Sequence, residues 1–175
     1  MDRPLCVPPH RLARARPRLG DGGPLVVTDP EPAPIFLPAD SGRTLDLLAV
    51  RHRLTSDQSG GSIYIFESTF EPRTGNRLHV HRREDEIGYV LDGALEVRLQ
   101  DGTRTLEAGG LARLPKGLPH ALRNPLEVPS RYLFLALPGG LDRWFDAIAA
   151  ANADGTLDDT TFRRLSDDVG LGWLE

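Results

Sequence analysis

Cysteine is almost absent from this chain, which carries a single one, Cys6, among its 175 residues. One cysteine excludes an internal disulfide and gives no sign of an oxidising compartment. No apolar run approaches the roughly 20 residues needed to cross a bilayer, and the first residues lack the apolar segment of a secretory signal. We therefore expect a cytoplasmic protein with no membrane partner.

Lysine is equally scarce, with Lys116 the only one, so arginine carries nearly all the basic charge, as is typical of a GC-rich bacterial genome. Residues 1–20 hold five arginines against one aspartate, about +4 in charge, while the whole chain carries −4. An arginine-rich arm could bind nucleic acid, but a solvated tail explains it as well. The rest of the chain is acidic and would not attract phosphate groups, so we expect no nucleic-acid partner.

Composition and hydrophobic pattern divide the chain into three parts. Residues 1–44 form an arm too rich in proline for regular helix or central strand. Its short apolar pieces, L-V-V at 25–27 and I-F-L at 35–37, could add an edge strand to the barrel or to a neighbouring subunit. Residues 45–137 should form the body, and residues 138–175 a helical segment packed on it.

Short runs of β-forming residues fill the stretch from Leu45 to Leu137, separated by turns such as S-G-G, D-G and P-K-G. Many short strands at regular spacing predict an antiparallel sandwich or barrel. Residues 100–102, Q-D-G, predict one hairpin between alternating runs.

A helical period begins after Pro138. One helix face would be formed by Leu141, Trp144, Phe145 and Ile148. A second helix would be capped by Asp158 or Asp159, would carry Phe162, Leu165 and Val169, and would end at Gly170. We expect Trp144 and Phe145 to pack against the outside of the barrel rather than to meet a substrate.

Two segments carry the chemistry of the chain. Residues 75–93 contain H-x-H-x4-E-x6-G, and residues 109–124 contain G-x5-P-x-G-x2-H-x3-N. Side chains two apart on a strand share a face, so His79 and His81 can grip one ion. Imidazole nitrogens and a carboxylate oxygen suit a divalent first-row metal.

The two segments resemble the paired signature motifs of the cupin superfamily. The matching residues are Gly75, His79, His81, Glu86, Gly93, Gly109, Pro115, Gly117, His120 and Asn124. Gly75 lies two residues nearer to His79 than is usual in the family. The resemblance implies an all-β jelly-roll barrel, a double-stranded β-helix, here with short C-terminal helices. It also implies one divalent transition metal (Mn, Fe, Co, Ni or Zn) held by His79, His81, Glu86 and His120.

Glu86 has a second expected role, because a carboxylate that can leave the metal can act as a general base toward a substrate hydroxyl. The alternative for all four residues is a metal-free barrel with polar side chains exposed on its strands. Glu84 and Asp85 do not fit the motif spacing and are expected to be solvated turn charges. His10 and His52 lie outside the motifs and are expected on the surface.

Strand parity suggests which residues border the metal. Gly88 and Leu122 would point inward and stand where many cupins hold aromatic rings, which would leave room for a larger or flatter ligand. The further expected pocket residues are Tyr64, Phe66, Arg77 and Phe134. For each of them, ordinary packing is the alternative.

The segments S-D-Q-S-G-G-S-I-Y-I-F-E, H-R-R-E-D-E and L-P-G-G-L-D-R-W-F resemble small quercetin-dioxygenase-like monocupins of soil bacteria. This resemblance implies a dioxygenase of quercetinase type that acts with O2 on a flavonol-like or other aromatic secondary metabolite. The alternatives are a cyclase, isomerase or lyase that uses the metal as a Lewis acid, and a ligand-binding cupin without turnover. We also expect a homodimer.

Overall fold

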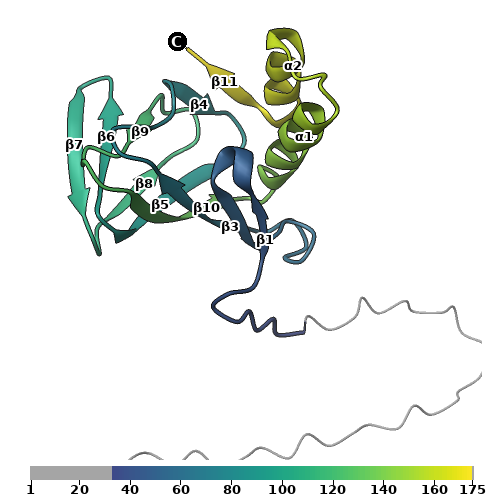
Figure 1. Ribbon diagram of the computed structural model, residues 1–175, viewed down its shortest axis with the longest axis horizontal. Helices are drawn as coiled ribbons and strands as arrows, with labels where there is room; N and C mark the ends of the chain where they lie inside the picture. Colours follow the sequence, from purple (N-terminus) through teal and green to yellow (C-terminus); the bar gives the residue numbers. More distant parts are fainter. Residues whose placement is uncertain (1–32, 175) are drawn as a thin grey trace, which may run out of the picture. The chain divides into compact units, whose positions relative to one another are not determined.

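The strands form an antiparallel barrel, seen in Figure 1, in the computed structural model, which describes residues 33–174. Within them, a six-stranded sheet has the order β1-β2-β3-β10-β5-β8, a three-stranded sheet the order β7-β6-β9, and β11 pairs with β4. The strands are β1 (Arg43–Leu45), β2 (Val50–Leu54), β3 (Tyr64–Phe70), β4 (His79–His81), β5 (Asp85–Asp92), β6 (Ala94–Leu99), β7 (Gly102–Glu107), β8 (Leu111–Leu114), β9 (Ala121–Arg123), β10 (Ser130–Leu137) and β11 (Leu171–Trp173), with a single 3-10 turn, η1 (Asp46–Leu48), after β1. The predicted jelly-roll architecture is confirmed.

Alternating side chains of the large sheet build the core of the barrel. On β10, Tyr132 and Phe134 point inward, and Phe134 lies opposite Phe66 of β3 on one side and Gly88 of β5 on the other. A Cβ atom on Gly88 would lie 2.9 Å from Cε1 of Phe134. Glycine at this position therefore allows the Phe134 ring to pack directly over β5.

Asn124, the last residue of the second motif, ties the loop before β10 to the barrel. It is fully buried, and its side-chain amide donates to the carbonyls of Phe70 (3.0 Å) and Val128 (2.7 Å). Its Oδ1 accepts bonds from the Ser130 hydroxyl and the Leu126 amide, each over 2.9 Å. A side chain that satisfies so many groups around a loop fixes the shape of that loop.

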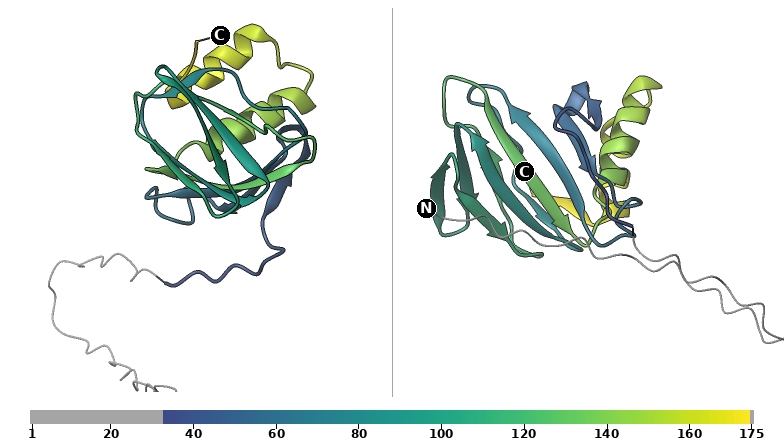
Figure 2. Two further views of the ribbon diagram at one scale, coloured as in Figure 1. Left: turned by 90° about the vertical axis from the view of Figure 1, so that its left-hand side faces the viewer. Right: turned by 90° about the horizontal axis from the view of Figure 1, so that it is seen from below.

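The C-terminal segment contains the two predicted helices, α1 (Asp142–Ala153) and α2 (Asp159–Val169). Asp158 caps α2 by accepting a 2.7 Å bond from the Thr161 amide, and Gly170 ends it in the left-handed conformation. Figure 1 and the right-hand view of Figure 2 show the helices on the opposite side of the barrel from the β6–β7 hairpin. The strand β11 that follows α2 was not expected.

The first described residues differ from the expectation for the arm. Residues 35–37 form no strand, and Phe36 is 86% exposed, because the edge position beside β2 is taken by β1. The L-V-V piece lies outside the described residues, as do His10 and the arginines of residues 1–20. No helix within residues 33–174 is long and apolar enough to cross a membrane.

Candidate metal centre

The four predicted ligands meet inside the barrel. His79 and His81 come from β4, Glu86 from β5, and His120 from the residue before β9. The backbones of His79 and His120 exchange two hydrogen bonds of 2.9 Å, and the Gly117 amide donates to the His81 carbonyl over 2.7 Å. The turn of the second motif is thus bonded directly to the strand of the first, which brings the two motifs together.

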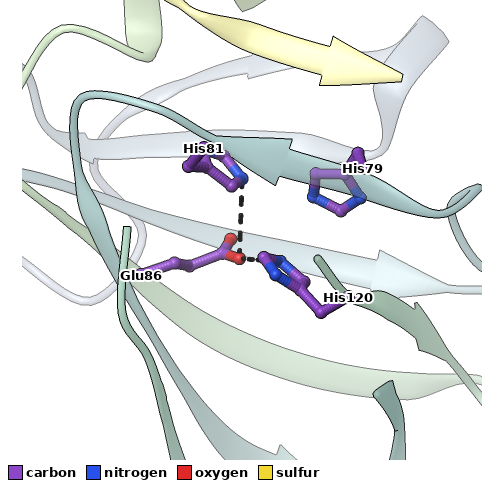
Figure 3. A group of neighbouring side chains, drawn as sticks. All are labelled: His79, His81, Glu86 and His120. Atoms are coloured by element: carbon purple, nitrogen blue, oxygen red, sulfur yellow. Dashed lines mark hydrogen bonds and ion pairs between the residues drawn. The ribbon is translucent and has the colours of Figure 1, made fainter. Parts of the chain in front are cut away.

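The ligand atoms are close enough to share one ion. They all lie within 4.8 Å of one another, and all four residues are buried. Oε2 of Glu86 is 3.0 Å from Nε2 of His120 and 3.7 Å from Nε2 of His81 (Figure 3). Adjacent ligands held at about 2.1 Å from an octahedral ion are about 3.0 Å apart, so the donor set fits a divalent transition metal.

The other nitrogen of each ring has an acceptor. Nδ1 of His79 is 2.8 Å from the Arg77 carbonyl, Nδ1 of His120 is 2.9 Å from the Leu118 carbonyl, and Nδ1 of His81 is 3.3 Å from Oε1 of Glu84. Such partners hold the proton on Nδ1 and leave the Nε2 lone pair for a metal. Nε2 lone pairs that converge on a carboxylate are stabilised by a proton or a metal cation between them, which is the physical reason to consider a metal site here.

Burial and neighbouring charges have opposing effects on the pKa values of the residues in this cluster. Burial, assisted by the charge of His120, lowers the pKa of His79 to about 4, so its ring is neutral at pH 7. Burial acts to raise the pKa of Glu86, but the hydrogen bond to His120 and the charge of His81 outweigh it and lower the pKa to about 2. Burial acts to lower the pKa of His81, and the bond to Glu84 reverses this and raises it.

A cavity of about 480 Å³ opens beside the ligands, with His79, His81 and Glu86 in its wall. Phe66, Arg77, Leu122 and Phe134, four of the six expected pocket residues, also line it. Its volume is within the range of small-molecule sites, and its wall is mainly apolar. The arrangement can hold a flat aromatic molecule with one edge at the metal ligands.

The other two expected residues, Tyr64 and Gly88, do not line this cavity. The Tyr64 ring stacks behind Phe66 at 4.8 Å, and its hydroxyl is 2.9 Å from Nδ1 of the buried His52. Burial, assisted by the charge of Asp142, raises the pKa of Tyr64, which keeps the phenol neutral. The space that Gly88 leaves is filled by Phe134 rather than opened to a ligand.

The sequence did not predict that aromatic residues of the C-terminal segment form one wall of the cavity. Trp144, Phe145, Phe162 and Trp173 all line the cavity, whereas Trp144 and Phe145 were expected to pack outside the barrel. The reason is β11, which pairs antiparallel with β4 and places Trp173 opposite His79, with ring centroids 5.2 Å apart. Periodicity identified the helix faces, but a three-residue strand gives no signal of its own.

Glu84 and His52 were also expected in the wrong surroundings, whereas the expectation for Asp85 was right. Glu84, expected to be a solvated turn charge, is buried and faces Nδ1 of His81, since the turn between β4 and β5 folds back over the ring. Asp85 does lie toward solvent, where it accepts bonds from Arg113 (2.6 Å) and the Lys116 amide (2.9 Å). His52, expected on the surface, is only 2% exposed because α1 covers β2 at that point.

Comparison with known proteins agrees with this geometry. Residues 66–136 match the family described as Cupin domain. The protein SchB of Streptomyces halstedii is 32% identical over 83 residues, which are 46% of this chain. The match spans 60% of the length of SchB, less than two thirds of that relative.

Solved structures show the same fold. KdgF from a Halomonas species is 23% identical, with a TM-score of 0.53 over 63% of this chain and 98% of that protein. An uncharacterised protein with a double-stranded β-helix domain from Klebsiella pneumoniae is 19% identical, with a TM-score of 0.50 over 62% of this chain and 92% of that protein. Residues 66–136 thus match a cupin domain, the solved structures share its fold, and the cluster of three histidines and one glutamate could hold a metal ion.

Proposed function

We propose that this protein is a metal-dependent dioxygenase of quercetinase type that acts on a flavonol-like or other aromatic secondary metabolite. The observation that carries the proposal is that the candidate metal ligands adjoin an aromatic cavity. Three histidines and one glutamate form a compact cluster, and three of its members, His79, His81 and Glu86, lie in the wall of an aromatic-lined cavity large enough for such a molecule.

A divalent transition metal bound by His79, His81, His120 and Glu86 would supply Lewis acidity toward a hydroxyl or carbonyl oxygen of the substrate. The chain itself supplies the remaining parts. The aromatic wall excludes water and orients the ring plane, and the acceptors of the three Nδ1 atoms keep the imidazoles in one orientation.

Glu86 is the residue proposed to accept the hydroxyl proton. Its low pKa ensures that the carboxylate is ionised, although it also makes Glu86 a weak base for an ordinary phenol. The proton transfer therefore requires a substrate hydroxyl that the site has made more acidic. The electron-rich ring left by deprotonation is then the partner for dioxygen, both atoms of which enter the product.

The test begins with elemental analysis of unchelated protein, for which about one equivalent of metal per chain is expected, with a large loss in His81→Ala. Oxygen uptake is then followed with a panel of flavonols and aromatic polyketides. Uptake in step with substrate loss supports the dioxygenase. Turnover that continues in an anaerobic chamber would favour a cyclase, isomerase or lyase, and saturable binding of an unchanged ligand would favour a binding protein.

A further inference from the structure

Arg77 occupies an unusual position at the edge of the metal-bearing cavity. Its guanidinium carbon lies 5.3 Å from the centre of the Trp173 ring and 5.7 Å from that of Phe162. Both rings and Arg77 itself line the cavity. A guanidinium held over aromatic faces keeps its N–H donors at its own edge, free to bond in the plane of the group.

In the described part of the chain, Arg77 lacks the carboxylate partner that several other surface arginines have. Arg73, four residues earlier, is bonded to Glu127 at 2.7 Å, and Arg104 pairs with Asp101 at 3.0 Å. Within residues 33–174, by contrast, no carboxylate lies within ion-pair distance of Arg77. Its positive charge is thus positioned by packing and is not neutralised by the protein.

The rings under Arg77 are themselves fixed. The indole N–H groups of Trp173 and Trp144 both donate to the hydroxyl of Ser166, over 3.0 and 3.1 Å. That hydroxyl donates in turn to the Phe162 carbonyl over 2.8 Å. One serine of α2 therefore holds both tryptophans in place, so Arg77 rests on a rigid aromatic surface.

Arg77 and the ligand His79 are two residues apart, and the His79 side chain is held by the 2.8 Å bond between its Nδ1 and the Arg77 carbonyl. Both residues line the same cavity, together with the aromatic wall. A single aromatic molecule can therefore reach from the metal ligands to the guanidinium while its ring lies along that wall.

We propose that Arg77 forms an anion-accepting subsite of this cavity, and that the substrate is an aromatic molecule with a second, acidic group, a carboxylate or an ionised phenol, remote from the group that meets the metal ligands. The inference rests on the proposed function only in taking the cavity as a site for an aromatic substrate. The subsite itself needs neither a metal nor dioxygen.

The experiment uses two fluorescent probes on the full chain, with metal and after chelation. Anilinonaphthalenesulfonate carries an anionic group, and phenylnaphthylamine has the same rings without it. In Arg77→Gln the sulfonate should bind roughly tenfold more weakly, as expected for loss of a charge-assisted bond, while the neutral probe binds as before. Arg77→Lys should retain part of the affinity, and Arg104→Gln, a surface control, should change neither probe.

Three results would overturn the proposal. The first is unchanged sulfonate affinity in Arg77→Gln with a native circular dichroism spectrum, and the second is an equal loss for both probes. The third is an equal effect of Arg163→Gln, since Arg163 and Arg77 both line a neighbouring hollow of about 460 Å³, and this result would place the anion there. Binding is read without turnover, so a failed oxygen-uptake assay would reject the dioxygenase and leave the subsite intact.

Discussion

The amides of His79 and His120 each donate to the carbonyl of the other residue, over 2.9 Å in both directions. Two proposed ligands from different motifs are therefore direct neighbours across an antiparallel bridge. Their spacing is set by the backbone and does not depend on the presence of an ion. The barrel backbone consequently holds two residues of the proposed metal site side by side.

Glu84 should matter for metal affinity although it is not a proposed ligand. Its carboxylate faces Nδ1 of His81 at 3.3 Å, and loss of such a partner typically weakens metal binding by about 10- to 100-fold. Competition with a chelator of known affinity measures this in Glu84→Ala. Glu107→Ala, which removes an exposed glutamate of β7, serves as the control, and equal affinities in the two variants would exclude this role of Glu84.

Glu86 should matter more for turnover than for holding the metal. In Glu86→Gln the three imidazoles and an amide oxygen of the same shape remain, so metal content should stay near normal. The rate should fall by a factor of roughly 10² or more, the usual scale for loss of a general base. Metal analysis and single-turnover assays on the same preparation measure both quantities. A variant that keeps its metal and most of its rate would show that another group takes the proton.

The homodimer expected from sequence stays a prediction, and the structure suggests where to test it. The outward face of β5 and β8 exposes Tyr89 directly opposite Leu111, and Leu111 is 57% exposed. If two copies pair through this face, Leu111→Arg should shift the mass seen in light scattering toward the 19.2 kDa of one chain, with metal content unchanged. Thr103→Arg on β7 is the control, and a single-chain mass for the unmodified protein would exclude the dimer.

Ser166 should contribute to stability out of proportion to its size. Its hydroxyl is buried and accepts the indole N–H bonds of Trp144 and Trp173. Ser166→Ala leaves both donors without an acceptor, and the free energy of unfolding should fall by about 2 kcal/mol or more. Urea titration followed by tryptophan fluorescence measures the loss. Ser62→Ala, at an exposed serine, should cost much less, and similar losses in both variants would refute the argument.

Sequence could predict the barrel and the ligand set because both depend on short-range patterns. The H-x-H spacing puts His79 and His81 on one face of a strand. The glycine and proline residues of the second motif mark the turns that bring His120 back to them. The bounds of α2 followed from period and caps, as Asp158 and Gly170 show. These are signals that a few neighbouring residues carry.

The wall of the cavity could not be predicted in the same way. It depends on β11, a strand of three residues that is formed by pairing with β4. Glu84 was missed for a similar reason, since the motif spacing identifies ligands but not the turn that folds back onto His81. Both cases depend on tertiary contacts between segments whose local sequence has no distinctive pattern.

His52 should make stability depend on pH through its burial. Its Nδ1 faces the Tyr64 hydroxyl at 2.9 Å, and Nε2 lies 3.3 Å from Oδ1 of Asp146, which also pairs with Arg43. Burial lowers the pKa of His52 below 6.5, and the charge of Asp146 opposes this only in part. The folded state therefore favours the neutral ring.

The sign of the effect follows from this lowered pKa. Above pH 6.5 the ring is neutral in both states, and its contribution to stability is complete. As the pH falls below that value, the unfolded chain binds a proton before the folded one does, so stability is lost until the folded pKa is passed. Urea titrations of chelated protein between pH 7.5 and 5 should show this loss for the unmodified chain. His52→Gln, which cannot titrate, should show a shallower slope, because the contributions of His79, His81 and Glu86 are common to both proteins. Parallel slopes would mean that His52 is protonated equally in the two states and that α1 does not shield it.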